Sequence, residues 1–135
     1  MGNVVIERWP EVPEGLDPAL AREFVENAGN GRVGSTLVSE TDRVRVWSLT
    51  LKPSERIGFH THVLDYFWTA VTGGSARSHY GDGRVAERSY KPGDTQHHTY
   101  GPGEFMTHDL ENTGTTDLVF TTVEFKDSAN APLAV

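Results

Sequence analysis

The chain of 135 residues has the length of a single domain. Hydrophobic residues make up 36%, and fourteen glycines and seven prolines favour short strands joined by turns over a helical bundle. A formal net charge of −7 argues against nucleic acid or a membrane surface as partner, and the lack of cysteine excludes disulfides and thiolate ligands. Because the sequence contains no long apolar segment, we expect a cytoplasmic protein.

Residues 1–32 are predicted to form an extended arm followed by one short helix. Prolines and a glycine interrupt the arm, and Asp17 and Pro18 supply a helix N-cap and a proline in the first turn. Apolar residues then recur at helical spacing up to Asn27, which predicts a helix over about residues 18–28. The arm is expected to pack on its own barrel or on that of a partner.

From residue 33 onward, short β-type segments alternate with turn residues, and residues 33–126 are expected to form one barrel. Nine strands are predicted, over residues 33–39, 43–51, 57–63, 66–72, 75–80, 84–90, 95–100, 104–111 and 117–126. Many short strands at regular spacing indicate an all-β sandwich or barrel. In the second strand, Val44 and Val46 are predicted to face the core and Arg45 to face solvent. Residues 127–135 are expected to be a frayed C-terminal tail.

Six histidines make metal binding the first chemistry to consider. Residues two apart on a strand face the same side, so His60 and His62 are predicted to project together. Imidazoles at this spacing suit Zn, Fe, Ni, Cu or Mn, and a third ligand from another strand would complete a set with open positions. The alternative is that both are exposed strand residues. As ligands they must be neutral, which requires a pH above the histidine pKa near 6.5.

The histidine pair belongs to a longer pattern. Residues 53–74 (PSERIGFHTHVLDYFWTAVTGG), together with His108 and Asn112, resemble the two motifs of the cupin superfamily: Gly, His-x-His, Glu and Gly, then His-x-x-x-Asn. The resemblance covers residues 33–126. It implies a small double-stranded β-helix, or jelly-roll, barrel and adds His108 to the His-x-His pair as a metal ligand. It also implies a homodimer, because cupins commonly pair through edge strands.

The sequence departs from the family pattern in three ways. Ser54 stands where the family has its opening glycine, and Tyr66 stands where it has glutamate. A phenol at that position is either a metal-bound or acid/base group or a packed core tyrosine. The second motif is preceded by extra residues, and one of His97 and His98 is expected to point into the barrel as a fourth ligand or proton shuttle. Asn112 is expected to hold a turn.

Within the superfamily, Arg-Val-x-x-Trp at 43–47 and Asp-Tyr at 65–66 are most similar to single-domain cupins of the β-alanine-degradation type, with a looser likeness to cupin polyketide cyclases. The resemblance implies a metal-dependent enzyme that acts on a small organic molecule and uses a divalent transition metal. An oxygenase is the leading hypothesis. The alternatives are a non-redox cyclase, isomerase or lyase, and a cupin that binds metal or ligand without turnover. Arg45, Arg77 and Arg84 are candidates for binding a substrate carboxylate.

Overall fold

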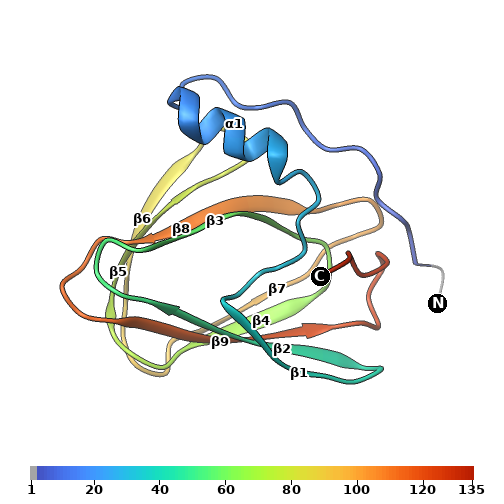
Figure 1. The fold of residues 1–135 in the computed structure, drawn as a ribbon. Helices are drawn as coiled ribbons and strands as arrows, with labels where there is room; N and C mark the ends of the chain where they lie inside the picture. The colour runs from blue at the N-terminus through green and yellow to red at the C-terminus, as the bar shows by residue number, and fades with distance from the viewer. Residues whose placement is uncertain (1–2) are drawn as a thin grey trace.

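The structure, a computed structural model, describes residues 3–135, which form one helix and nine strands (Figure 1). The strands are β1 (Thr36–Glu40), β2 (Val44–Leu51), β3 (Arg56–His62), β4 (Tyr66–Ala70), β5 (Gly74–His79), β6 (Val85–Tyr90), β7 (Thr95–His98), β8 (Met106–Asn112) and β9 (Leu118–Phe125). They form a five-stranded sheet in the order β1-β2-β9-β4-β7 and a four-stranded sheet in the order β3-β8-β5-β6. The predicted all-β fold with one short helix is confirmed.

The helix, α1 (Pro18–Glu26), lies over the four-stranded sheet (Figure 1). Asp17 caps it as predicted, because its Oδ1 accepts hydrogen bonds from two backbone N–H groups of the first turn. Phe24 is buried and packs edge-to-face on Phe59 of β3, with ring centroids 5.1 Å apart. Among the described residues, no helix is long and apolar enough to cross a membrane.

The N-terminal arm packs on its own chain. Residues 1–2 of the predicted arm lie outside the described residues. Further along, the backbone N–H of Val4 donates to the carbonyl of Ala129 at 2.8 Å, and the carbonyl of Val4 accepts from the N–H of Ala131 at 2.7 Å. The arm and the C-terminal tail are therefore joined by one parallel β-bridge, between Val4 and Asn130.

An apolar cluster joins the two sheets. Its buried members come from five strands and are Leu49, Leu51, Ala70, Ala76, Leu110, Leu118 and Phe120. Trp68 and Tyr90 pack against the cluster, and their rings and that of Phe120 make edge-to-face contacts with centroids 4.9 to 5.4 Å apart. Burial of this apolar surface fixes how the sheets face each other.

Strand β2 contradicts the predicted orientation of its first half. Its buried side chains are those of Arg45, Trp47, Leu49 and Leu51, whereas those of Val44 and Val46 are half-buried. Trp47 has no exposed surface, and Arg45 shares its face because the two are two residues apart. The Arg45 guanidinium is stabilised there by Glu40, whose Oε2 accepts from Nε at 2.9 Å, and by the carbonyl of Leu133.

Asn112 holds the turn after β8, as predicted. Its side-chain amide donates to the carbonyls of Leu51 and Thr116, at 2.9 and 2.8 Å. Its Oδ1 accepts from the backbone N–H of Gly114 at 2.9 Å. The residue is buried, so these bonds supply partners for backbone groups that lack access to water.

The C-terminal tail is anchored, and the prediction that it is frayed was wrong. Asn130 has no exposed surface. Its side-chain amide donates to the carbonyls of Val63, Gly101 and Glu104 at 3.0 to 3.2 Å, and its Oδ1 accepts from the backbone N–H of Gly103 at 2.7 Å. One amide therefore joins the tail to the loops that follow β3 and β7.

Asn130 should accordingly be a stability determinant. Replacing it with Ala leaves several buried backbone groups without a partner, which costs about 1–3 kcal/mol for each group that water cannot reach. We expect Asn130→Ala to lower the free energy of unfolding by at least that amount in urea titration. Asp127→Asn, at an exposed position of the same tail, is the control and should change it little. Equal stability of Asn130→Ala and wild type would contradict the anchoring role.

Candidate metal centre

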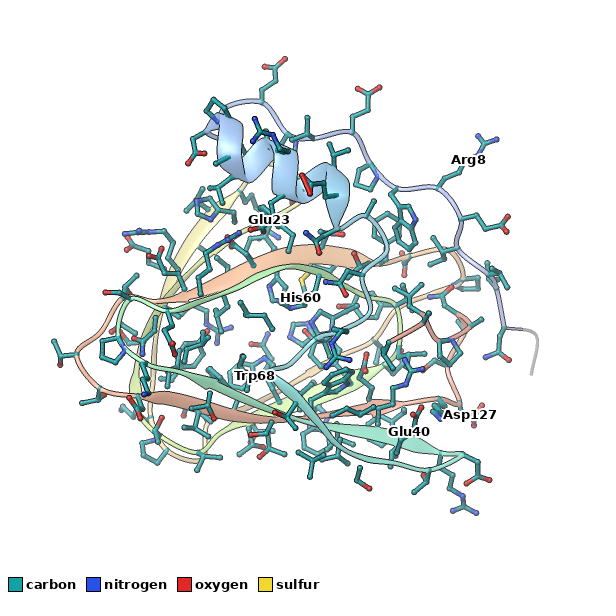
Figure 2. The ribbon with its side chains drawn as sticks, viewed as in Figure 1. Arg8, Glu23, Glu40, His60, Trp68 and Asp127 are labelled. Atoms are coloured by element: carbon teal, nitrogen blue, oxygen red, sulfur yellow. The ribbon has the colours of Figure 1, made fainter. Side chains whose placement is uncertain are left out.

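Three histidines from two neighbouring strands gather on the inner face of the four-stranded sheet. His60 on β3 lies directly opposite His108 on β8, so the two rings project to the same side, and His62 follows two residues after His60. The three ring centroids are 4.7 to 5.3 Å apart, and the ring planes are inclined to one another by 69° to 70°. One nitrogen of each ring lies within 4.8 Å of the others. Figure 2 shows His60 in the space between the two sheets.

A β-bulge in β3 sets the position of His60. Ile57 and His60 are three residues apart, but their partners on β8 are only two apart, so β3 contains one extra residue here. The backbone N–H of Phe59 donates to Oε2 of Glu23 on α1, at 2.9 Å. His60 Nδ1 lies 2.8 Å from the carbonyl of Gly58, which can only accept, so Nδ1 carries the proton and Nε2 is free to bind a ligand.

Arg56 connects α1 to both histidine-bearing strands. Its Nη1 and Nη2 each donate to one oxygen of Glu23 at 2.7 Å, and its Nε donates to Oδ2 of Asp109 at 2.8 Å. Asp109 has no exposed surface and also accepts from the backbone N–H and the ring of His79. The hydrogen bond from Arg56 is the main reason that the pKa of Glu23 lies below its usual value. Arg56 and Glu23 are therefore both ionised at neutral pH.

Burial keeps the three imidazoles neutral. It lowers the pKa of His60 to about 4 and those of His62 and His108 well below the ordinary value. The three histidines therefore stay neutral at a lower pH than the ordinary histidine pKa near 6.5 predicts. Nδ1 of His62 and Nδ1 of His108 are buried and have no hydrogen-bond partner among residues 3–135. Neutral imidazole nitrogens that lack other partners are the donors that a divalent transition metal needs. The three histidines can therefore hold such an ion.

The histidines line a cavity of about 70 Å³ between the sheets. Tyr66 on β4 stacks on His62, with centroids 4.0 Å apart and planes inclined by 14°. It also stacks on His98 of β7, at 4.8 Å and 8°. His98 lines the cavity, whereas His97 is exposed, so one of the two points inward as expected. Burial raises the pKa of Tyr66 well above its usual value, which leaves the phenol protonated.

Sequence reasoning missed a buried carboxyl group next to Tyr66. Glu124 on β9 lies opposite Tyr66 in register and is 3% exposed. Its Oε1 accepts a hydrogen bond from the indole N–H of Trp47 at 2.7 Å, and burial raises its pKa to about 7. Strand alternation could have identified it, because Leu118, Phe120 and Glu124 share one face of β9.

None of the three arginines predicted to bind a substrate carboxylate lines the cavity. Each is paired with the protein's own carboxylates: Arg45 with Glu40, Arg77 with Glu87 and Glu111, and Arg84 with Asp82. The arginine that does line the cavity is Arg88 on β6. The sequence gives no pattern that would have distinguished it, because β6 carries mostly exposed residues.

Comparison with protein-family models and with curated proteins finds no match for this sequence. Solved structures do match. A cupin domain from Bordetella pertussis Tohama I is 25% identical, with a TM-score of 0.59 over 67% of this chain and 90% of that one. A protein from Klebsiella pneumoniae with a double-stranded β-helix domain is 29% identical, with a TM-score of 0.54 over 74% and 82%. A cupin family protein from Methanocaldococcus jannaschii shares the fold, with 18% identity and a TM-score of 0.51 over 70% and 84%.

The histidine group should be necessary for metal binding. Changing His60, His62 or His108 singly to Ala removes one of three donors, so we expect bound Zn²⁺ or Fe²⁺ to fall well below one equivalent after dialysis while the β-type circular dichroism persists. Elemental analysis of the dialysed protein measures the occupancy. His97→Ala is the matched control because His97 is exposed, and it should keep wild-type occupancy. Full occupancy in all three variants would contradict the ligand assignment.

Glu124 should make stability depend on pH. Its pKa is about 7 in the folded protein and near 4.5 when solvated, so in between the folded state binds more protons, and stability falls as pH rises through this window. Glu124→Gln keeps an acceptor for Trp47 but cannot ionise. Between pH 4.5 and 8, the free energy of unfolding of the variant should therefore rise by about 3 kcal/mol relative to that of wild type. Urea unfolding in EDTA measures this difference. Glu87→Gln, at an exposed position, should show no such trend. A constant difference across this range for Glu124→Gln would refute the prediction.

Proposed function

We propose that this protein, which has the double-stranded β-helix fold of cupin domains, is a metal-dependent enzyme that acts on a small organic molecule. The observation that carries the proposal is the group of three buried imidazoles on the wall of a cavity. Structural metal sites are usually closed by four protein ligands, whereas three protein ligands leave a position open for substrate or water. The described residues supply three, and the cavity gives a substrate access to them.

The reaction class that we propose first is an oxygenase reaction. Iron or copper held by His60, His62 and His108 would supply dioxygen chemistry, and any divalent ion there would supply Lewis acidity. Apolar and aromatic side chains such as Leu49, Trp68 and Phe120 line much of the cavity. Such walls suit both the body of an organic substrate and the apolar dioxygen molecule.

The chain's own residues would orient the ligand set and carry protons. The hydrogen bond from His60 Nδ1 to Gly58 holds that imidazole in one tautomer, with Nε2 available. Tyr66 keeps a proton on its phenol oxygen beside His62, and His98 stacks on the same ring. Tyr66 and His98 both line the cavity, so the phenol would donate a hydrogen bond to the substrate and the imidazole of His98 would accept or return a proton there.

The protonated phenol is also the observation that favours a second candidate. A non-redox cyclase, isomerase or lyase needs a proton donor beside a Lewis acid, and Tyr66 provides one without any change in oxidation state. A cupin that binds metal or ligand without turnover would need no such donor. The similarity of segments 43–47 and 65–66 to cupins of the β-alanine-degradation type is compatible with any of these classes.

We extend the proposal to partners and location. A small-molecule substrate, rather than nucleic acid or a membrane, suits a chain with a net charge of −7. A homodimer would pair through an edge strand. β1 is the end strand of its sheet and carries Val38, which is 61% exposed. A cytoplasmic location is the expectation for a sequence without a long apolar segment.

Metal analysis and dioxygen uptake test the proposed function. Protein purified without a histidine tag should contain close to one equivalent of a transition metal. The iron- or copper-loaded protein should consume dioxygen with a subset of small organic acids, as measured with an oxygen electrode. Tyr66→Phe should keep the metal and the melting temperature, and lose turnover by about 100-fold or more. Conversion by the zinc-loaded protein without dioxygen would favour the second candidate, and failure to bind any of these metals would overturn both.

A further inference from the structure

We propose that Arg88 is the anion-binding residue of the cavity and that the substrate is a small organic acid whose carboxylate Arg88 binds. This names the substrate class of the enzyme proposed above and therefore rests on the proposed function. The observations that carry it concern the charge of the cavity, the unpaired state of Arg88 and the groups that hold its guanidinium.

The cavity has the opposite charge balance from the chain as a whole. Asp and Glu outnumber Lys and Arg by nineteen to twelve in the sequence. In the part of the chain that the structure describes, however, no Asp or Glu lines the cavity, and Arg88 is the one Lys or Arg that does. An acidic protein whose cavity excludes carboxylates and includes a guanidinium selects an anionic ligand electrostatically.

The charge of Arg88 is not neutralised by the protein. Within residues 3–135, Arg88 makes no ion pair with a carboxylate, whereas Arg77 and Arg84 both do. Its Nη1 donates to Oε1 of Gln96 at 2.7 Å, and the amide oxygen of Gln96 is neutral. A guanidinium has five N–H donors, so most of those of Arg88 remain free for a ligand.

Aromatic rings hold the guanidinium at the cavity. Its central carbon lies 5.4 Å from the ring centroid of Trp68 and 5.3 Å from that of Tyr90. Arg88 lies opposite the buried Ala76 in register, so its side chain leaves β6 on the cavity side, although Arg88 itself is exposed to solvent. Gln96 belongs to β7 of the other sheet, so its hydrogen bond with Arg88 spans the gap between the two sheet edges. The guanidinium is therefore pre-positioned before a ligand arrives.

The shape of the site limits the acid to a small one. The cavity is small, with about 70 Å³ of space, which favours a small acid over a large one. The planar fork of a guanidinium matches the two oxygens of a carboxylate, and a lysine would not provide this match. Trp68, which lies between the sheets in Figure 2, offers an apolar face beside it.

Binding of small acids to the metal-free protein tests this proposal. Calorimetric titration in EDTA would use acetate, propionate, butyrate and benzoate, with the corresponding amides as neutral probes of the same shape. We expect saturable binding for at least one acid, with its amide bound at least 10-fold more weakly. Arg88→Gln should weaken binding of that acid at least 10-fold, and Arg88→Lys should restore only part of it. Arg77→Gln removes the same charge from an arginine that does not line the cavity and should bind like wild type.

The outcomes separate this proposal from the proposed function. Because the titration is done without metal, a protein that binds no metal can still show acid binding that depends on Arg88. Conversely, normal metal binding with no effect of Arg88→Gln on acid binding would overturn only the anion site. The site is also overturned if amides bind as well as acids, if inorganic phosphate binds and no carboxylate does, or if no acid binds at all. A melting temperature like that of wild type establishes that Arg88→Gln is folded.

Discussion

The carboxylate of Glu23 is the contact on which the geometry of the histidine group depends. It accepts two hydrogen bonds from Arg56 and one from the backbone N–H of Phe59, which lies in the bulge of β3. Without it that N–H would have no partner, and a buried unpaired donor costs about 1–3 kcal/mol. Gly58 makes the approach possible, since a Cβ there would lie 3.0 Å from Oε2 of Glu23. The helix thereby fixes the extra residue that places His60 opposite His108.

Much of this site could be predicted because the spacing of residues along the sequence determines which side chains share a face. His60 and His62 share a face through strand alternation alone, and the motif pattern supplies the distant third histidine. The backbone conformation is kept even where the sequence departs from that pattern. Ser54, which stands where the cupin motif has glycine, has a φ of 72°. That is the left-handed region that glycine occupies most easily, so the turn is retained at some cost in backbone strain.

The errors of prediction share a different physical cause. Arg45, Glu124 and Asn130 are polar side chains that look suited to solvent, yet all three are buried. Each is stabilised by a partner far away in the sequence: the carbonyl of Leu133, the indole of Trp47 and the carbonyl of Val63, respectively. Local pattern cannot report such partners, because burial of a polar group is favourable only once the whole fold has brought its hydrogen-bond partner into place.

Tyr66, which stands where the cupin motif has glutamate, bears on the proposed substrate class. A glutamate at this position would bring a negative charge to the histidine group, whereas the buried phenol stays neutral. Three neutral imidazoles likewise add no negative charge, so a divalent ion held by them would keep its full charge. Together with the unpaired guanidinium of Arg88, this leaves a cavity whose described lining offers a carboxylate ligand attraction and no carboxylate to oppose it. On this view, replacing glutamate by tyrosine makes the site more selective for an acid, because it removes the one anion that the family pattern would have placed there.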